Sequence, residues 1–160
     1  MLWLVPTART IAFTPGRRAI DPAQAVLLAF LLTGLYLIID GPIQALIDGV
    51  LPGTRFGAYP SSHGVLHSID MTFGLALVAY QEELVFRRCA RAVFGKWLGD
   101  GLGMIVATSL LFGAYHWWSG IGNVATAALF GLGSMSLYRR AAVLWPVVLS
   151  HYLVDLAGFA

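Results

Sequence analysis

The hydrophobic residues of this chain fall into five long stretches that are separated by short polar or glycine- and proline-rich breaks. Long apolar runs of this kind, with few charges inside them, are typical of membrane-spanning helices, which need roughly 17–25 residues. Asp40, Gly41 and Pro42 are expected to stop the first run, and Gly99, Asp100 and Gly101 to form a turn after the second. The pattern predicts helices over residues 23–39, 65–97, 102–118, 121–138 and 143–159.

The segment 43–67 is mixed in character and interrupts this pattern. It contains Pro52, Gly53, Gly57, Pro60 and Gly64, so we expect a loop or a re-entrant, interfacial segment there. The fold class that follows is all-α: a polytopic membrane helical bundle with about five transmembrane helices. The fourth predicted helix carries small residues that should let it approach its neighbours closely, namely Ala127, Gly131, Gly133 and Ser134.

Composition supports a membrane protein. Of the 160 residues, 58% are hydrophobic and only 11% are charged, whereas soluble domains carry about 25% charged residues. The single cysteine, Cys89, excludes an internal disulfide and a cysteine-based zinc cluster. No nucleic-acid-binding motif is present, and the lipid bilayer is the expected partner. We expect a single membrane domain over 1–160, with a core at about 65–160 preceded by an N-terminal segment, the first span and a loop in 1–64.

The placement of positive charge predicts an orientation. All the Lys and Arg residues except Arg55 fall in the N-terminal segment, around the connection between the second and third spans, or between the fourth and fifth spans. These three regions lie on one side of a five-span bundle. The positive-inside rule therefore predicts a multi-pass protein of the cell membrane with a cytoplasmic N-terminus.

Two adjacent carboxylates, Glu82 and Glu83, interrupt an otherwise apolar run. Ionisable groups at membrane depth cost roughly 2.5–3.5 kcal/mol each on insertion scales, and they usually mark a functional site that faces the bundle interior. On a helix, Glu83 and Arg87 share a face, while Glu82 points about 100° away. Glu83 can therefore pair within its own helix, as a structural ion pair or as part of a site, and Glu82 cannot.

Two histidines and one more acid lie inside the later spans: His116, His151 and Asp155. If the second and third helices form a hairpin that turns at Gly99, Glu82 and His116 both lie about 25 Å from the turn, at about 1.5 Å per residue, and so at one depth. His151 and Asp155 are four residues apart and share a helical face. A carboxylate, a histidine on the next helix and a His–acid pair on a third helix are sufficient to activate water and stabilise an oxyanion.

At these residues the chain resembles the CPBP intramembrane proteases, a family that includes type II CAAX prenyl endopeptidases, bacteriocin-processing enzymes and abortive-infection proteins. The resemblance rests on three motifs in order within hydrophobic segments, and it covers roughly half of the chain. The motifs are Glu82-Glu83-x-x-x-Arg87, Phe112-x-x-x-His116, and His151-x-x-x-Asp155.

The resemblance implies an intramembrane endopeptidase of the glutamate type. Glu82 and His116 would hold and activate the attacking water, Glu83 and Arg87 would complete the first motif, and His151 with Asp155 would contact the oxyanion. Asp155 stands where asparagine is frequent in the family, so it would either be protonated or orient His151. No cofactor is expected, although zinc held by Glu82, His116 and His151 is compatible with the sequence.

The substrate would be a membrane-associated protein or peptide, such as a prenylated tail, a leader peptide or a C-terminal sorting helix, and the residues select none of these. One alternative is a non-catalytic membrane scaffold or immunity protein that retains the motifs for structure. A small transporter with an acidic proton relay is disfavoured because no inverted repeat is visible. His63 and His67 have metal-like spacing but lie outside the spans, and Cys89 is expected to serve packing. Oligomeric state is undetermined by the sequence.

Overall fold

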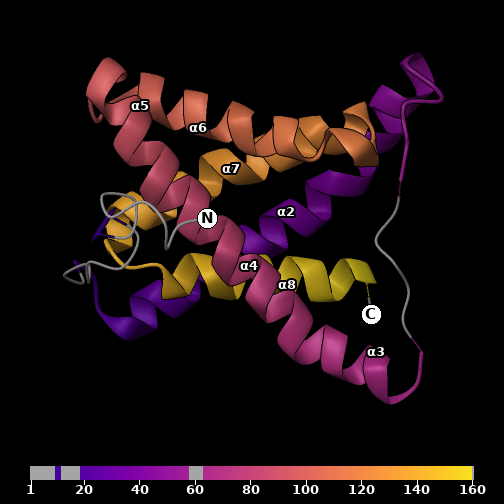
Figure 1. Cartoon of the computed structure of the whole chain (residues 1–160), viewed down its shortest axis with the longest axis horizontal. Coiled ribbons are helices and arrows are strands. Elements are labelled where there is room, and N and C mark those ends of the chain that lie inside the picture. Colours follow the sequence, from indigo (N-terminus) through magenta and orange to yellow (C-terminus); the bar gives the residue numbers. More distant parts are fainter. Residues whose placement is uncertain (1–9, 12–18, 58–62, 160) are drawn as a thin grey trace.

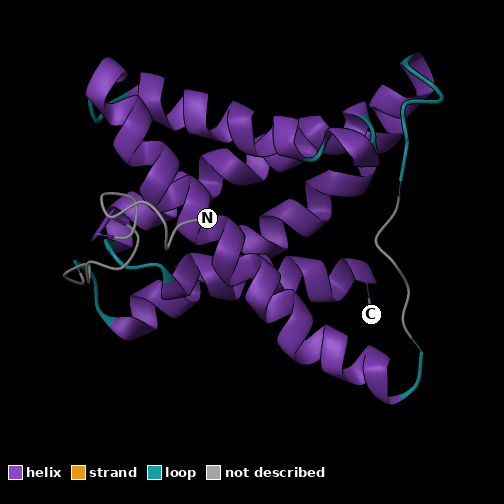
Figure 2. Cartoon of the chain, in the orientation of Figure 1, coloured by secondary structure: helices purple, strands orange, loops and turns teal. Residues whose placement is uncertain are grey.

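The computed structural model describes residues 10–11, 19–57 and 63–159, and in these ranges it is helical without strands. Five long helical segments cross one another in a bundle (Figures 1 and 2). The all-α bundle predicted from the sequence is therefore confirmed. The elements are α2 (Pro22–Val50), α3 (Val65–Ile69), η2 (Asp70–Gly74), α4 (Leu75–Glu83), η3 (Leu84–Ala90), α5 (Arg91–Leu98), α6 (Leu102–Tyr115), η4 (Trp117–Ser119), α7 (Ile121–Ala141) and α8 (Trp145–Phe159).

Helix α2 begins with a strong start signal. The Asp21 side chain accepts a hydrogen bond from the Gln24 amide at 2.9 Å, and Pro22 occupies the first helical position, where its missing N–H costs nothing. The predicted stop at Asp40-Gly41-Pro42 is wrong, because α2 continues through Pro42 to Val50. Proline is tolerated inside helices of membrane proteins, and the Gln44 amide donates to the Asp40 carboxylate at 2.8 Å across this point. The predicted loop over 43–67 is correspondingly shorter.

The second predicted helix is confirmed as one uninterrupted helical path from α3 to α5, which ends at Gly99 with a positive φ of 68°. Two stretches of this path are π-helical, η2 and η3. The second of them begins directly after Glu83 and includes Arg87. Single π-turns inside α-helices occur frequently at functional sites.

Helices α6 and α7 pack closely because small residues meet at their contact. A Cβ placed on Gly113 would lie 2.7 Å from the Ala128 Cβ, and one placed on Gly131 would lie 3.0 Å from the Ser109 Cα. The predicted close approach at Gly131 is therefore confirmed. This packing fixes the end of α6, where His116 is the C-cap residue and has a non-helical conformation. The third helix therefore ends at Tyr115, earlier than the predicted residue 118.

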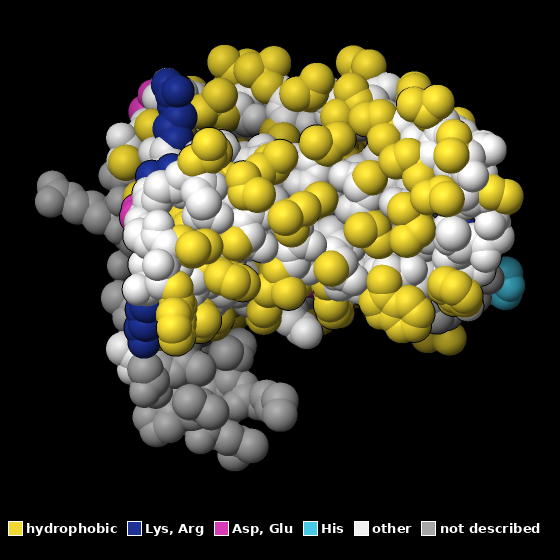
Figure 3. Space-filling view, turned by 90° about the horizontal axis from the view of Figure 1, so that it is seen from above, with side chains coloured by type: hydrophobic (Ala, Val, Ile, Leu, Met, Phe, Trp, Pro, Cys, Tyr) yellow, Lys and Arg dark blue, Asp and Glu magenta, His cyan; other side chains and the backbone are white. Residues whose placement is uncertain are grey.

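The outer surface of the bundle is apolar, and Figure 3 shows a broad band of hydrophobic side chains between the two ends. Large hydrophobic residues such as Leu31, Ile38, Phe73 and Leu110 are more than half exposed. Helices α2 and α7 are each long and apolar enough to cross a membrane. Most of the predicted N-terminal segment lies outside the described residues.

Candidate active site

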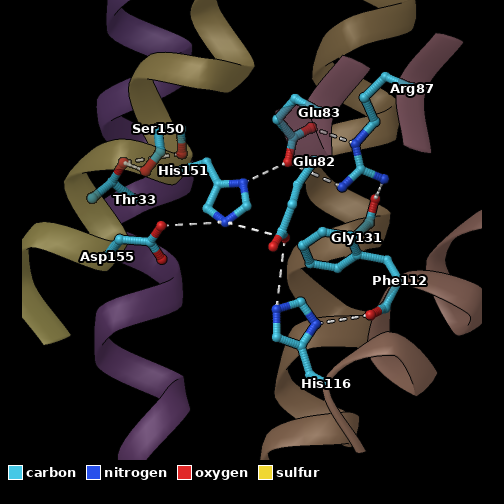
Figure 4. A network of polar contacts seen from close by, with 10 residues as sticks. All are labelled: Thr33, Glu82, Glu83, Arg87, Phe112, His116, Gly131, Ser150, His151 and Asp155. Carbon is cyan, nitrogen blue, oxygen red and sulfur yellow. Dashed lines mark hydrogen bonds and ion pairs between the residues drawn. The ribbon is translucent and has the colours of Figure 1, made fainter. Parts of the chain in front are cut away.

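Three helical segments bring the candidate side chains together at the centre of the bundle (Figure 4). Glu82 extends from α4 between two histidines, one at the end of α6 and one on α8. Its Oε2 atom lies 3.7 Å from His116 Nε2 and 3.9 Å from His151 Nε2. The common depth predicted for Glu82 and His116 is therefore observed.

Glu83 and Arg87 form the intrahelical pair that their spacing predicted. Arg87 donates from Nε to Glu83 Oε2 at 2.6 Å and from Nη2 to Oε1 at 3.3 Å, and neither side chain is exposed. The third contact of Arg87 is the Gly131 carbonyl, 3.5 Å from Nη1. Its guanidinium also lies 4.9 Å from the centre of the Phe112 ring.

His151 connects this buried pair to Glu82. Its Nδ1 donates to Glu83 Oε1 at 2.8 Å, and its Nε2 lies 3.6 Å from Asp155 Oδ2. The ring therefore has a carboxylate at each nitrogen, which fixes its orientation. Arg87, Glu83 and His151 form a continuous chain of charge-assisted contacts that ends beside Glu82.

His116 is oriented by the end of its own helix. The last carbonyls of a helix have no intrahelical partner, and the Phe112 carbonyl accepts a hydrogen bond from His116 Nδ1 at 2.9 Å. With Nδ1 protonated, the neutral ring presents an unprotonated Nε2 toward Glu82. The Phe112 ring also packs against both histidines, with ring centres 4.8 Å from His116 and 5.7 Å from His151.

A cavity of about 660 Å³ opens at this cluster. Its wall includes Glu82, His116, His151 and Asp155, whereas Glu83 and Arg87 lie behind the wall. The size falls within the range of about 300–1,000 Å³ that is usual for ligand sites. Four of the six predicted site residues can therefore meet a ligand directly, and the other two can act only through them.

The three candidate zinc ligands do not form a metal site in the described part of the chain. Tetrahedral zinc with ligand bonds of about 2.0–2.1 Å needs donor atoms about 3.3 Å apart, and both histidine Nε2 atoms lie farther than this from Glu82 Oε2. Among the described residues, no group of three or more His, Cys, Asp and Glu side chains has an arrangement that would hold a metal ion. His63 precedes α3 rather than lying on it, so it shares no helical face with His67.

A polar stripe on α2 was missed by the sequence reasoning because the helix was expected to end before it. Asp40, Gln44 and Asp48 lie one turn apart, and Asp40 and Gln44 line the cavity. Arg55 donates to Asp48 Oδ2 at 3.1 Å and to Gln44 Oε1 at 3.3 Å. The i, i+4, i+8 spacing is the sequence signal that could have revealed this face.

A comparison with protein families identifies the family of the chain. Residues 64–157, well over half of the chain, match the family described as type II CAAX prenyl endopeptidase Rce1-like. The chain belongs to this family, as the resemblance of its motifs indicated, and it is a membrane protease. No curated protein and no solved structure matches the chain.

Proposed function

We propose that this protein is a multi-pass intramembrane endopeptidase in which Glu82 acts as the general base and His116 holds the attacking water. The observation that carries the proposal is the position of Glu82 Oε2, which faces both histidine Nε2 atoms at the wall of the cavity. Both distances exceed a direct hydrogen bond, and contacts of this length commonly have a bridging water between them. Among the described residues, none makes a hydrogen bond with this oxygen.

The reaction follows from the donors and acceptors around that position. A water that donates one hydrogen bond to Glu82 and one to His116 Nε2 directs its oxygen lone pair at a substrate carbonyl. As the C–O bond forms, Glu82 takes the water proton and the carbonyl oxygen becomes an oxyanion. Glu82 then passes the proton to the amide nitrogen, the C–N bond breaks, and the two products are a carboxylate and an amine.

His151 is placed to stabilise the oxyanion. When both of its ring nitrogens are protonated, Nδ1 donates to Glu83 and Nε2 can donate into the cavity, a geometry suited to a developing negative charge. Asp155, whose Oδ2 lies 3.6 Å from that Nε2, orients the ring. Glu83 and Arg87 are positioning residues, because they are fully buried and contact the cavity wall from behind, Glu83 at His151 and Arg87 at the Phe112 ring.

The alternative of a non-catalytic scaffold predicts a different environment for Glu82. A purely structural carboxylate at this depth should be enclosed and saturated with hydrogen bonds. Glu82 lines the cavity, and its Oε2 is buried without a hydrogen bond from the described residues, so the carboxylate is not saturated. This observation supports the enzyme over the scaffold or immunity protein.

The substrate class follows from the location of the site within a membrane bundle. It is a membrane-associated protein or peptide that enters the cavity in an extended form. The charge distribution supports a cytoplasmic N-terminus.

The test compares wild type with Glu82→Gln and His116→Ala in cells, by quantifying new protein termini in the membrane fraction. Loss of a positioned general base typically costs 10²–10⁴-fold in rate, so termini produced by the wild type should disappear in both variants. Asp21→Asn is the matched control, since asparagine caps a helix as well as aspartate does. If both site variants kept the wild-type termini, the proposed mechanism would be wrong.

A further inference from the structure

The two ends of the bundle differ in charge. Figure 3 shows the Lys and Arg side chains gathered along one end of the apolar band. In the described residues, Arg88, Arg91 and Lys96 line one cavity with Asp100, and Arg139, which contacts Asp100, lies with Arg140 in the last turn of α7. We call this end of the bundle the cationic end. The opposite end carries Arg55, which is paired with Asp48 at 3.1 Å.

The cavity opens toward the end opposite the cationic end. Beyond the catalytic cluster, its wall is formed by the second half of α2, the segment after it, the α6–α7 connection and the last turn of α8. Each of these parts lies at the opposite end of the bundle, because α2, α6 and α8 run away from the cationic end and α7 runs back to it (Figure 1). The wall at this end includes Gln44, Arg55, Trp118, Asn123 and Phe159.

The path from the site to the cationic end is closed. Directly behind Glu82 lie Glu83 and Arg87, both without exposed surface. A second cavity of about 470 Å³ at the cationic end reaches Arg87, but it shares no lining residue with the active-site cavity. Beyond them a hydrophobic core continues, which includes Met104, Met135 and Tyr138. A substrate can therefore reach Glu82 from the opposite end but not through the cationic end.

Positive charge marks the cytoplasmic side of membrane proteins. From the charge asymmetry and the one-sided cavity, we infer that the active site opens to the non-cytoplasmic face of the membrane. The substrate is then a membrane-anchored polypeptide whose scissile bond lies at or just inside the non-cytoplasmic boundary of the bilayer. A prenylated tail in the cytoplasm would meet the closed end. This inference rests on the proposed function for the identity of the substrate, but the direction of the opening does not depend on catalysis.

The side of the membrane to which the cavity opens can be measured by cysteine labelling at two matched glycines. Gly158 lines the cavity at the opposite end, Gly101 lies in the turn at the cationic end, and a Cβ at either position meets nothing within 4 Å. In a Cys89→Ala background, Gly158→Cys and Gly101→Cys each provide a single thiol. A membrane-impermeant maleimide applied to intact cells should label Gly158→Cys, and should label Gly101→Cys only after permeabilisation. The reverse result would overturn the inference.

The substrate class is tested separately, by mapping the cleavage positions that depend on Glu82. In cells that express the wild type or Glu82→Gln, cleavage positions lost in the variant should lie in segments at the non-cytoplasmic boundary of membrane proteins. Positions in cytoplasmic tails would overturn the substrate assignment. Absence of any Glu82-dependent cleavage would count against the proposed function instead, while the maleimide labelling would still decide which side the cavity faces.

Discussion

The buried pair of Glu83 and Arg87 allows a quantitative prediction, because both side chains have no exposed surface and their closest atoms lie 2.6 Å apart. Arg87→Met removes the cation and leaves the buried Glu83 carboxylate with His151 as its remaining partner. Glu83→Gln removes the anion and leaves the buried guanidinium without a carboxylate. The double variant removes both charges together. It should therefore be much less destabilised than the sum of the two single variants.

The expected magnitude follows from the geometry of the pair. Two unit charges about 4 Å apart attract by about 4 kcal/mol at an effective dielectric constant of 20, and removal of one partner of a buried pair typically costs about 3–5 kcal/mol. For a chain of this size, 1 kcal/mol corresponds to roughly 2–4 °C in Tm. Arg87→Met should thus lower the apparent Tm by roughly 6–20 °C, with a coupling energy of about 3–4 kcal/mol in the cycle.

The assay is thermal unfolding of the purified full chain and its variants in one detergent, followed by near-ultraviolet circular dichroism. Arg91 and Asp100 supply the matched control cycle, since their closest charged atoms lie 2.8 Å apart but their side chains are 34% and 57% exposed. An exposed pair of this kind should couple by less than about 1 kcal/mol. Equal coupling in the two cycles would refute the argument that burial makes the Glu83–Arg87 contact strong.

Three further predictions concern packing, metal and pH. Gly113→Ala should destabilise the protein and reduce cleavage, because the new Cβ would lie 2.7 Å from the Ala128 Cβ and would displace the end of α6 that carries His116. Gly103→Ala is the control: its nearest neighbour is 3.9 Å away, so Tm and activity should hardly change. Zinc chelators should leave cleavage unchanged in the purified enzyme, and an activity restored only by added zinc would contradict the mechanism. The hydrogen bond from Arg91 holds the pKa of Asp100 below its ordinary value. Because this pKa is lower in the folded than in the unfolded protein, the Asp100 carboxylate stabilises the fold at pH values above its unfolded-state pKa, and that stabilisation is lost as the pH falls through the folded-state pKa. Asp100→Asn should therefore cost at most roughly 2–4 °C in Tm at neutral pH. That difference should shrink below about pH 3.9, and a deficit that persisted in acid would rule out a charge-based cause.

The sequence predicted the helical path and the central cluster well, because both follow from strong periodic signals. A long apolar run and the matched spacing of Glu82 and His116 about the Gly99 turn are sufficient to place these two groups at one depth. Similarly, the four-residue spacing of Glu83 and Arg87 is sufficient to predict their ion pair.

The sequence failed where membrane context changes a local rule. Asp40-Gly41-Pro42 is a stop signal in water, but α2 continues through it, and the polar stripe that begins at Asp40 was consequently missed. The role of the Phe112 carbonyl was also invisible in the residue pattern, since it depends on where α6 ends. Likewise, motif spacing alone could not predict that Glu82 lines the cavity whereas Glu83 lies behind its wall.

The central claim is that Glu82 acts as the base at the cavity wall, and its most direct test is the cleavage rate of Glu82→Gln on a substrate identified from the wild-type-dependent termini. The substitution keeps the shape of the side chain and disturbs no hydrogen bond to Oε2 from the described residues. If Glu82 is the base, Glu82→Gln should have an unchanged Tm and a cleavage rate lower by at least about 10²-fold. Cleavage at the wild-type rate by a folded Glu82→Gln protein would contradict it.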